Sequence, residues 1–170
     1  MKKDAFNDLS VKVPGYEPWI TSQDKRIIHK TLNQNMLTFG PQLERFEKLF
    51  ANYTKSKYAI AVSNCTAALH LSLKAIGINK NDEVIIPDLT FVADANAILA
   101  CNAKPVIVDI NKENFFLSIS NIKKNITKKT KAIIPVHIYG QVCNIEEILD
   151  VAKDNNLKVI EDCAHAVGTF

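Results

Sequence analysis

The segment VIEDCAHAVGTF, residues 159–170, joins the end of an apolar strand to two adjacent carboxylates. Val159 and Ile160 have the character of a buried strand, and Glu161 and Asp162 follow them directly. A carboxylate at the end of a buried strand costs free energy unless a positive group or hydrogen-bond donors stabilise its charge. The sequence therefore predicts a cationic partner for Asp162, and the rest of the chain indicates which one.

Short apolar runs of strand length alternate with amphipathic windows of helix length from residue 58 onward. Five strands that are apolar on both faces and separated by helices are typical of a parallel sheet covered on both sides. The predicted fold class is therefore α/β, with a largely parallel open sheet flanked by helices. In such sheets ligands bind beyond the carboxyl ends of the strands. The five runs are YAIAVS (58–63), EVIIPD (83–88), PVIVDI (105–110), KAIIPVHI (131–138) and KVIED (158–162).

Two helices are predicted before the first strand. Residues 1–20 end in VPGYEPWI, where two prolines and a glycine oppose a helix. Ser22 is a candidate cap for a helix that runs to about Asn33, and Pro41 suits the first position of a second helix.

Composition argues against several classes of partner. The net charge is +3 and only Arg26 and Arg45 are arginines, so guanidinium forks that read guanine edges are scarce and we expect no nucleic-acid partner. No apolar run reaches about 18 residues, so we expect no membrane span. The four cysteines form no CxxC pair and the four histidines form no HExxH motif, so we expect no metal site. Reduced, mostly buried thiols in a cytoplasmic protein are the corresponding expectation.

The first run is followed by Ser63-Asn64-Cys65-Thr66-Ala67, which opens into a predicted helix. Free backbone N–H groups at a helix N-terminus attract an anion, and small side chains let the anion approach. Thr66 adds a hydroxyl donor. The alternative is that Ser63 or Asn64 only caps the helix and that no anion binds. The sequence contains neither GxGxxG nor a Walker loop, which disfavours a dinucleotide or a nucleoside triphosphate as the ligand.

Three more residues near strand ends suit a planar, charged ligand. Phe91 can lie over a ring or can pack against the sheet. Asp162 can pair with a protonated ring nitrogen or can cap the next helix. His165 can hydrogen-bond a polar group of the same ligand, or can be a satisfied core histidine. An anion cradle, an aromatic shelf and an acid for a ring nitrogen together describe pyridoxal phosphate (PLP).

At these residues the sequence resembles the DegT/DnrJ/EryC1/StrS family of sugar aminotransferases, in the aspartate aminotransferase superfamily. The similar segments run in the family's order from about Gly40 to Gly168, and GYEPWI and the cysteine of EDCAHA are similar to perosamine synthases in particular. They include AIAVSNCTAALHLSLKAIGI, DEVIIPDLTFVADANAI, TKAIIPVHIYGQVCNIEEI and VIEDCAHAVG.

The resemblance implies an incomplete large domain of the fold type I PLP-dependent transferases. Residues 1–40 are then an N-terminal segment with the first helix, residues 41–170 are the partial PLP-binding large domain, and the C-terminal small domain is absent. In this family the lysine that forms a Schiff base with PLP follows the EDCAHA segment. We therefore expect that lysine beyond Phe170, no catalytic residue within the chain, and no activity of the 170 residues alone. The cofactor-binding residues implied are Cys65, Thr66 and Ala67 for the phosphate, Phe91 for the ring face, Asp162 for the ring nitrogen and His165 near the phenolic oxygen.

The activity implied is transfer of an amino group from glutamate to a nucleotide-linked 4-keto-6-deoxy or 3-keto sugar, by a homodimer. Such products serve the synthesis of surface polysaccharide, O-antigen for example, or of related amino sugars. Two alternatives stay open: a PLP-dependent NDP-sugar dehydratase of the same family, in which histidine replaces the lysine, and a non-catalytic PLP-binding or pseudogene product.

Overall fold

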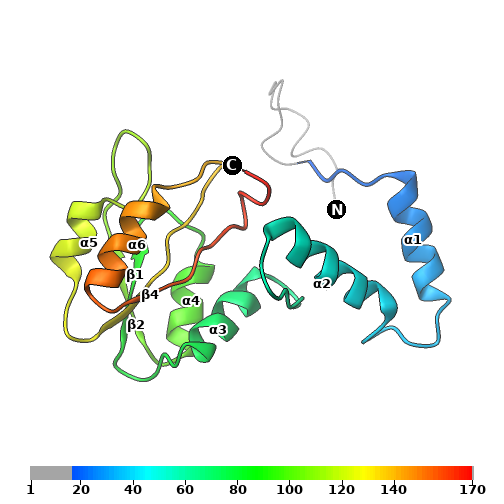
Figure 1. Cartoon of the computed structure of the whole chain (residues 1–170), viewed down its shortest axis with the longest axis horizontal. Helices are drawn as coiled ribbons and strands as arrows, with labels where there is room; N and C mark the ends of the chain where they lie inside the picture. The colour runs from blue at the N-terminus through cyan, green and yellow to red at the C-terminus, as the bar shows by residue number, and fades with distance from the viewer. Residues whose placement is uncertain (1–16, 170) are drawn as a thin grey trace, which may run out of the picture. The chain divides into compact units, whose positions relative to one another are not determined.

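The computed structural model describes residues 17–169, which belong to two compact units, residues 1–61 and 62–170. Each unit is described by itself, and Figure 1 shows the elements of both. Most of the irregular N-terminal stretch, residues 1–16, lies outside the described residues. The predicted boundary between the N-terminal segment and the PLP-binding domain, after residue 40, comes from the family resemblance and not from compactness. It stays a prediction.

Helix α1 (Ser22–Leu32) opens the described part of the first unit. Its N-cap is Thr21 rather than Ser22, the cap that the sequence predicts. The Asp24 amide donates to Thr21 Oγ1 (3.2 Å), and the Thr21 amide donates to the Asp24 carboxylate (2.7 Å). This reciprocal box needs an acceptor three residues after the cap, and a cap at Ser22 would place Lys25 there.

Helix α2 (Pro41–Thr54) follows in the same unit, with Pro41 at its first position as predicted. Its C-cap is Lys55, which adopts the left-handed conformation with φ 54°. No residue of α1 or α2 is buried, and Phe46, Leu49 and Tyr53 of α2 each expose more than half of their surface. Local propensity and capping, rather than a core, therefore define these two helices.

The second unit is built on a parallel sheet of four strands, β1 (Glu83–Pro87), β2 (Lys104–Val108), β3 (Thr130–Ile133) and β4 (Lys158–Val159). The strand order is β2-β1-β3-β4, so the chain passes from β1 to β2 on one side and then to β3 on the other. Open α/β sheets bind ligands where the strand order reverses in this way. The predicted α/β class and parallel sheet are confirmed.

The predicted strand at residues 58–63 is not formed. The segment has no regular secondary structure, and it is not part of the sheet. A strand requires a ladder partner, and neither edge strand, β2 or β4, pairs with this segment in the described part of the chain. Ile60 and Val62 are correspondingly exposed. The prediction of five strands is therefore wrong by one.

Four helices cover the two faces of the sheet, as predicted (Figure 1). They are α3 (Cys65–Ala75), α4 (Ala93–Ala100), α5 (Ile119–Asn125) and α6 (Ile145–Asp154). Residues of α3 and α4 form one core with Val84 and Ile86, whereas residues of α5 and α6 form a second core with Ile85. Successive strand residues point to opposite faces, so β1, which is buried along its whole length, contributes to both cores.

The edge strands are less buried than the sequence predicts. Ile107 of β2 exposes 59% of its surface, and β4 contains only Lys158, which is exposed, and Val159, which is half-buried. An edge strand has a neighbour on one side only, so its side chains are covered less completely. Burial on both faces thus holds for β1 but not for every strand.

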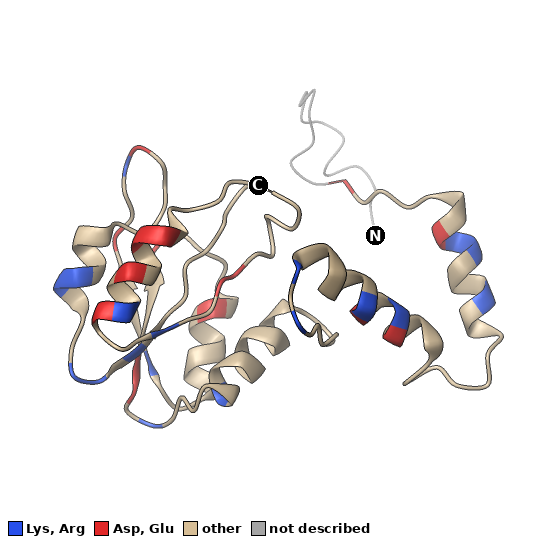
Figure 2. Cartoon of the chain, in the orientation of Figure 1, with Lys and Arg blue, Asp and Glu red and all other residues tan. Residues whose placement is uncertain are grey.

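Several charged residues of α5 and α6 are placed as the helix dipole favours, although Asp154 puts an acid at the end of α6 (Figure 2). α6 has Glu146 and Glu147 in its first turn and Lys153 in its last, and α5 has Lys123 and Lys124 in its last turn. Acids near the N-terminus and bases near the C-terminus of a helix are stabilising. Among the described helices, none has the length and apolar character that crossing a membrane requires.

Candidate cofactor site

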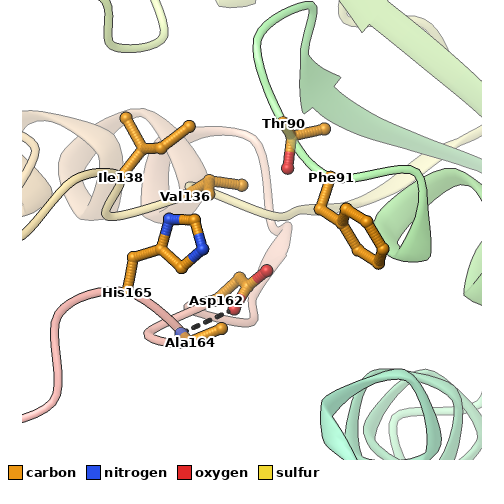
Figure 3. A pocket seen from close by; sticks show the side chains of 7 residues that line it. All are labelled: Thr90, Phe91, Val136, Ile138, Asp162, Ala164 and His165. Carbon is orange, nitrogen blue, oxygen red and sulfur yellow. Dashed lines mark hydrogen bonds between the residues drawn. The ribbon is translucent and has the colours of Figure 1, made fainter. Parts of the chain in front are cut away.

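A small pocket lies where the chain leaves the carboxyl ends of β1, β3 and β4 (Figure 3). Three of the residues that the sequence predicts, Phe91, Asp162 and His165, line it together. They come from segments far apart in the chain, and they meet because parallel strands end at the same edge of the sheet. The full lining is Thr90, Phe91, Val136, Ile138, Asp162, Ala164 and His165.

Asp162 is the buried acid of this pocket and exposes 5% of its surface. Its amide donates to the Pro135 carbonyl oxygen (2.9 Å), and its carbonyl oxygen accepts from the His137 amide (3.0 Å). On the side chain, Oδ1 accepts from the Ala164 amide (2.9 Å) and from the Cys65 thiol (3.6 Å). The alternative that Asp162 caps a following helix is not observed, because residues 164–168 form turns and the bond from the Ala164 amide to Oδ1 closes the first of them. Oδ2 has no hydrogen bond to a described residue, so it is available to a donor in the pocket.

The N-terminus of α3 lies beside Asp162, because Cys65 is the first residue of this helix and its thiol contacts that carboxylate. Asn64 is the N-cap, and its Oδ1 accepts from the Ala67 amide (2.9 Å). Of the two predicted capping residues, Asn64 is therefore the one that caps α3. Its side chain already binds the Ala67 amide, which the sequence assigns to the phosphate. The first amides of a helix have no intrahelical acceptor, so the N–H groups of Cys65 and Thr66 stay available to an anion.

The Cys65 thiol is a hydrogen-bond donor rather than a nucleophile. Desolvation of the sulfur and the adjacent Asp162 carboxylate raise the pKa of this thiol to about 11, so it stays protonated at neutral pH. Cys65 and Cys163 are exposed, whereas Cys101 and Cys143 are buried. The prediction of mostly buried thiols is therefore correct for only two of the four.

The Phe91 side chain projects away from the core, with 70% of the residue exposed. Its carbonyl oxygen accepts from the Asp94 amide (3.3 Å), which anchors the backbone at the start of α4. The alternative that Phe91 packs against the sheet is not observed. An exposed aromatic face in a pocket wall can stack on a planar ligand.

His165 is exposed, and its ring stacks on Tyr139 with centroids 6.0 Å apart and an angle of 29° between the planes. The alternative of a buried core histidine is therefore not observed. No hydrogen bond to a described residue occupies the ring nitrogens of His165, so they can contact a polar group of a ligand.

Sequence reasoning misses Thr90, which lines the pocket, and Asp94, which lies behind it. Asp94 is fully buried in the first turn of α4; its Oδ2 accepts from the Thr90 hydroxyl, and its Oδ1 has no partner among the described residues. Burial raises the pKa of Asp94 to about 6, opposed by the Thr90 hydrogen bond and reinforced by the charge of Asp162. The signal in the sequence is a lone acid inside the otherwise apolar window FVADANAILA.

Comparison with known proteins shows the family of this chain. The sequence model of the DegT/DnrJ/EryC1/StrS aminotransferase family matches residues 18–170. The chain belongs to this family. It is 44% identical over 158 residues to a GDP-perosamine synthase from Escherichia coli O157:H7, which covers 92% of this chain and 43% of that protein.

Solved structures of aminotransferases share the fold of this DegT/DnrJ/EryC1/StrS chain. NtdA from Bacillus subtilis with bound cofactor PMP (pyridoxamine phosphate) is 40% identical, with a TM-score of 0.81 over 88% of this chain and 35% of that one. The aminotransferase from Psychrobacter cryohalolentis is 36% identical, with a TM-score of 0.85 over 90% of this chain and 40% of that one. The predicted architecture, part of a fold type I domain, is confirmed. The chain spans less than half the length of each of these relatives.

Donors and acceptors in this pocket, and at the N-terminus of α3 beside it, fit a pyridoxamine or pyridoxal phosphate. A pyridinium N–H needs an acceptor, for which Asp162 Oδ2 is suited, and a phosphate needs donors, for which the amides of Cys65 and Thr66 are suited. Phe91 offers a face for the ring. None of the lining residues is a lysine.

Proposed function

We infer that this chain forms the cofactor-binding part of a PLP-dependent nucleotide-sugar aminotransferase. The observation that carries this inference is Asp162, which is buried, has Oδ1 satisfied by two donors and keeps Oδ2 free at the pocket. Asp162 forms no salt bridge with a described residue, and a buried carboxylate of this kind is stabilised by a cation that binds beside it. The neighbouring helix N-terminus and exposed Phe91 complete the set that a phosphorylated pyridine requires.

PLP, when bound, supplies an electron sink and carries the amino group between substrates. In this pocket Asp162 would hold the proton on the ring nitrogen, which that electron sink requires. The Ala164 amide and the Cys65 thiol hold Oδ1 of the carboxylate, which leaves Oδ2 for the ring. Phe91 would cover one face of the ring. The amides of Cys65 and Thr66, with the Thr66 hydroxyl, would bind the phosphate.

The lysine that attaches the cofactor is proposed to lie outside residues 1–170. Lys158, the lysine nearest to Asp162 in sequence, begins β4, and Asp162 follows the opposite end of that strand. Four residues of extended chain span about 13 Å, which places the two groups at opposite ends of the segment. The 170 residues alone are therefore expected to bind the cofactor without turning over substrate.

The proposed substrates are glutamate, as amino donor, and a nucleotide-linked 4-keto-6-deoxy or 3-keto sugar, as acceptor. Support comes from the relative that is a GDP-perosamine synthase and from NtdA, whose bound cofactor is PMP. The amino sugar formed would serve surface polysaccharide or related biosynthesis, and the whole protein is proposed to be a cytoplasmic homodimer.

Reading the gene through and beyond the codon for Phe170 is the first test. A lysine in the loop that follows supports the aminotransferase, and a histidine at that position favours the dehydratase alternative. The protein encoded by the whole reading frame is then expressed and incubated with ¹⁵N-glutamate and a GDP-linked 4-keto-6-deoxy sugar. The sugar is analysed by mass spectrometry. We expect ¹⁵N in the sugar; loss of water from the sugar without incorporation of ¹⁵N would contradict the proposal.

A further inference from the structure

His137 is buried beside the pocket without lining it, and 2% of its surface is exposed. Its backbone amide donates to the Asp162 carbonyl oxygen (3.0 Å). Its ring has two polar contacts, because Nδ1 accepts from the Cys143 amide (3.1 Å) and Nε2 lies 3.0 Å from Glu161 Oε2. His137 thus contacts both acids that follow β4: Asp162 through its backbone and Glu161 through its ring. Its ring also binds the Cys143 amide, in the loop that follows β3.

The Cys143 contact determines which ring nitrogen carries the proton. A backbone N–H can only donate, so Nδ1 of His137 must be the acceptor. In the neutral ring the proton is then on Nε2, which donates to the carboxylate of Glu161. The contact between His137 and Glu161 is therefore a hydrogen bond with a defined direction.

The same tautomer argues against a metal at this position. His137 Nε2, a Glu161 carboxylate oxygen and Cys163 Sγ lie within 4.8 Å of one another, which would otherwise suit a cation. Coordination would need the lone pair of Nε2 and a proton on Nδ1. That Nδ1–H would face the N–H of Cys143, two donors against each other. The ring of His137 therefore serves as a donor to Glu161.

Backbone pairing continues past β4, because the Ile160 amide donates to the Ile133 carbonyl oxygen (3.1 Å), but the pairing is interrupted at Pro135. β4 ends at Val159, and Pro135 has no N–H to donate to the neighbouring segment. Asp162 keeps two backbone bonds, one to the Pro135 carbonyl oxygen and one from the His137 amide. Side chains alternate along an extended segment, so holding Glu161 on the side of His137 directs Asp162 to the opposite side, into the pocket.

We propose that His137 is a positioning residue which, through its hydrogen bond to Glu161, sets the direction in which Asp162 enters the cofactor pocket. It touches neither cofactor nor substrate. The proposal rests on the proposed function, because the direction of Asp162 matters for binding only if Oδ2 meets a ring nitrogen.

Substitutions separate the two contacts of the ring. His137→Gln keeps an N–H donor near the place of Nε2 and loses the acceptor for Cys143. His137→Asn keeps an acceptor near the place of Nδ1 and loses the donor to Glu161, and His137→Leu removes both. Glu161→Ala removes the acceptor from the other side and completes a double-mutant cycle with His137→Leu.

Two measurements on the purified 170-residue protein test the proposal. The first is hydrogen exchange at the Asp162 amide, with the Ile134 amide, which donates to Ile85 (2.8 Å), as the reference for general stability. The second is affinity for PMP by calorimetry, because PMP carries an amine and needs no lysine. In the Asn and Leu variants and in Glu161→Ala we expect the Asp162 amide to exchange about tenfold faster and PMP to bind about tenfold more weakly, with Ile134 unchanged. His137→Gln should stay near wild type, and Glu161→Ala should add nothing to His137→Leu.

Two results would overturn the proposal: unchanged exchange at Asp162 in every variant, or equal acceleration at Asp162 and Ile134 in the Gln and Leu variants alike. Failure of the wild-type protein to bind PMP would instead contradict the proposed function. The exchange pattern across the variants then decides alone whether His137 holds Asp162.

Discussion

Asp162 divides its two oxygens between the protein and the pocket. Oδ1 is engaged by an amide and a thiol, and Oδ2 is left for the ligand. In Asp162→Asn the side chain keeps its shape and loses the charge that stabilises a pyridinium. We expect the affinity for PMP to fall about 10- to 100-fold, the usual effect of losing a hydrogen bond to a charged group.

The matched control for this prediction is Asp88→Asn. Asp88 directly follows β1, is exposed and does not line the pocket. Calorimetric titration of both variants with PMP should show near wild-type affinity for Asp88→Asn. An equal loss in the two variants would mean that overall charge, rather than Asp162, governs binding.

Asp94 makes the stability of the second unit depend on pH. Its folded-state pKa of about 6 lies above the ordinary value of 3.8, because burial disfavours the charged form. Between these pH values the folded state binds more protons than the unfolded state, so the free energy of unfolding decreases as pH rises from about 4 to about 6. Above about pH 6 the contribution of Asp94 to the free energy of unfolding stays at this lower level.

Replacing Asp94 with Asn removes the charge and keeps an acceptor for the Thr90 hydroxyl. We expect Asp94→Asn to raise the free energy of unfolding by about 1–2 kcal/mol at pH 7 and to have little effect below pH 4. Urea unfolding of both proteins at the two pH values checks this. A variant that is less stable at pH 7 would show that the charged form of Asp94 is needed for folding.

At this scale the sequence predicts residues in the loops that follow strands. Asp162 and Phe91, which both line the pocket, are noticed because a charge or an aromatic in such a loop has few structural reasons to be there. Asp94 and His137 are missed because their roles depend on contacts with Thr90, Glu161 and other residues that only the folded structure brings together. No local pattern marks which buried polar residue contacts a residue of the pocket.

Among the elements, α3 depends on its cap. The side chain of Asn64 accepts from the Ala67 amide, and this bond fixes the turn that presents the amides of Cys65 and Thr66. We expect Asn64→Ala to lower the free energy of unfolding by about 1 kcal/mol. Asn64→Ser should keep most of the stability that the cap contributes, because serine is also a good N-cap. Denaturant unfolding followed by circular dichroism measures both. If the Ala variant matched wild type, the cap would contribute no net stability.

Helices were easier to predict than strands in this chain because the helical signal is local. Periodicity and an N-terminal proline identify α2 from its own residues. The apolar segment 58–63 has the same strand-like composition as 83–88, yet only the second segment pairs within the sheet. Composition describes what a strand could bury, but pairing depends on a neighbour elsewhere in the chain.

On the scale of the whole molecule, the two units differ in how much surface their helices bury. α1 and α2 contain no buried residue, whereas the second unit has a core on each face of its sheet. Amide protection follows the free energy of local opening. We expect amides of α1 and α2 to exchange rapidly and those of β1 and β3 to exchange slowly, as measured by mass spectrometry of peptides after deuterium labelling. Equal protection of α1 and β1 would contradict this.

The contact between Cys65 and Asp162 joins residues that are 97 positions apart, whereas Glu83 and Lys104 of the neighbouring strands β1 and β2 are only 21 apart. Closing a short loop costs less entropy than closing a long one, so β1, α4 and β2 are expected to associate before the segment that carries Asp162 joins them. On the ribosome this order is reinforced, because Asp162 is among the last of these residues to be synthesised. A cofactor that binds beside Asp162 would therefore meet strands β1 and β2 already paired. It would stabilise the completed site but would not direct the pairing of those strands.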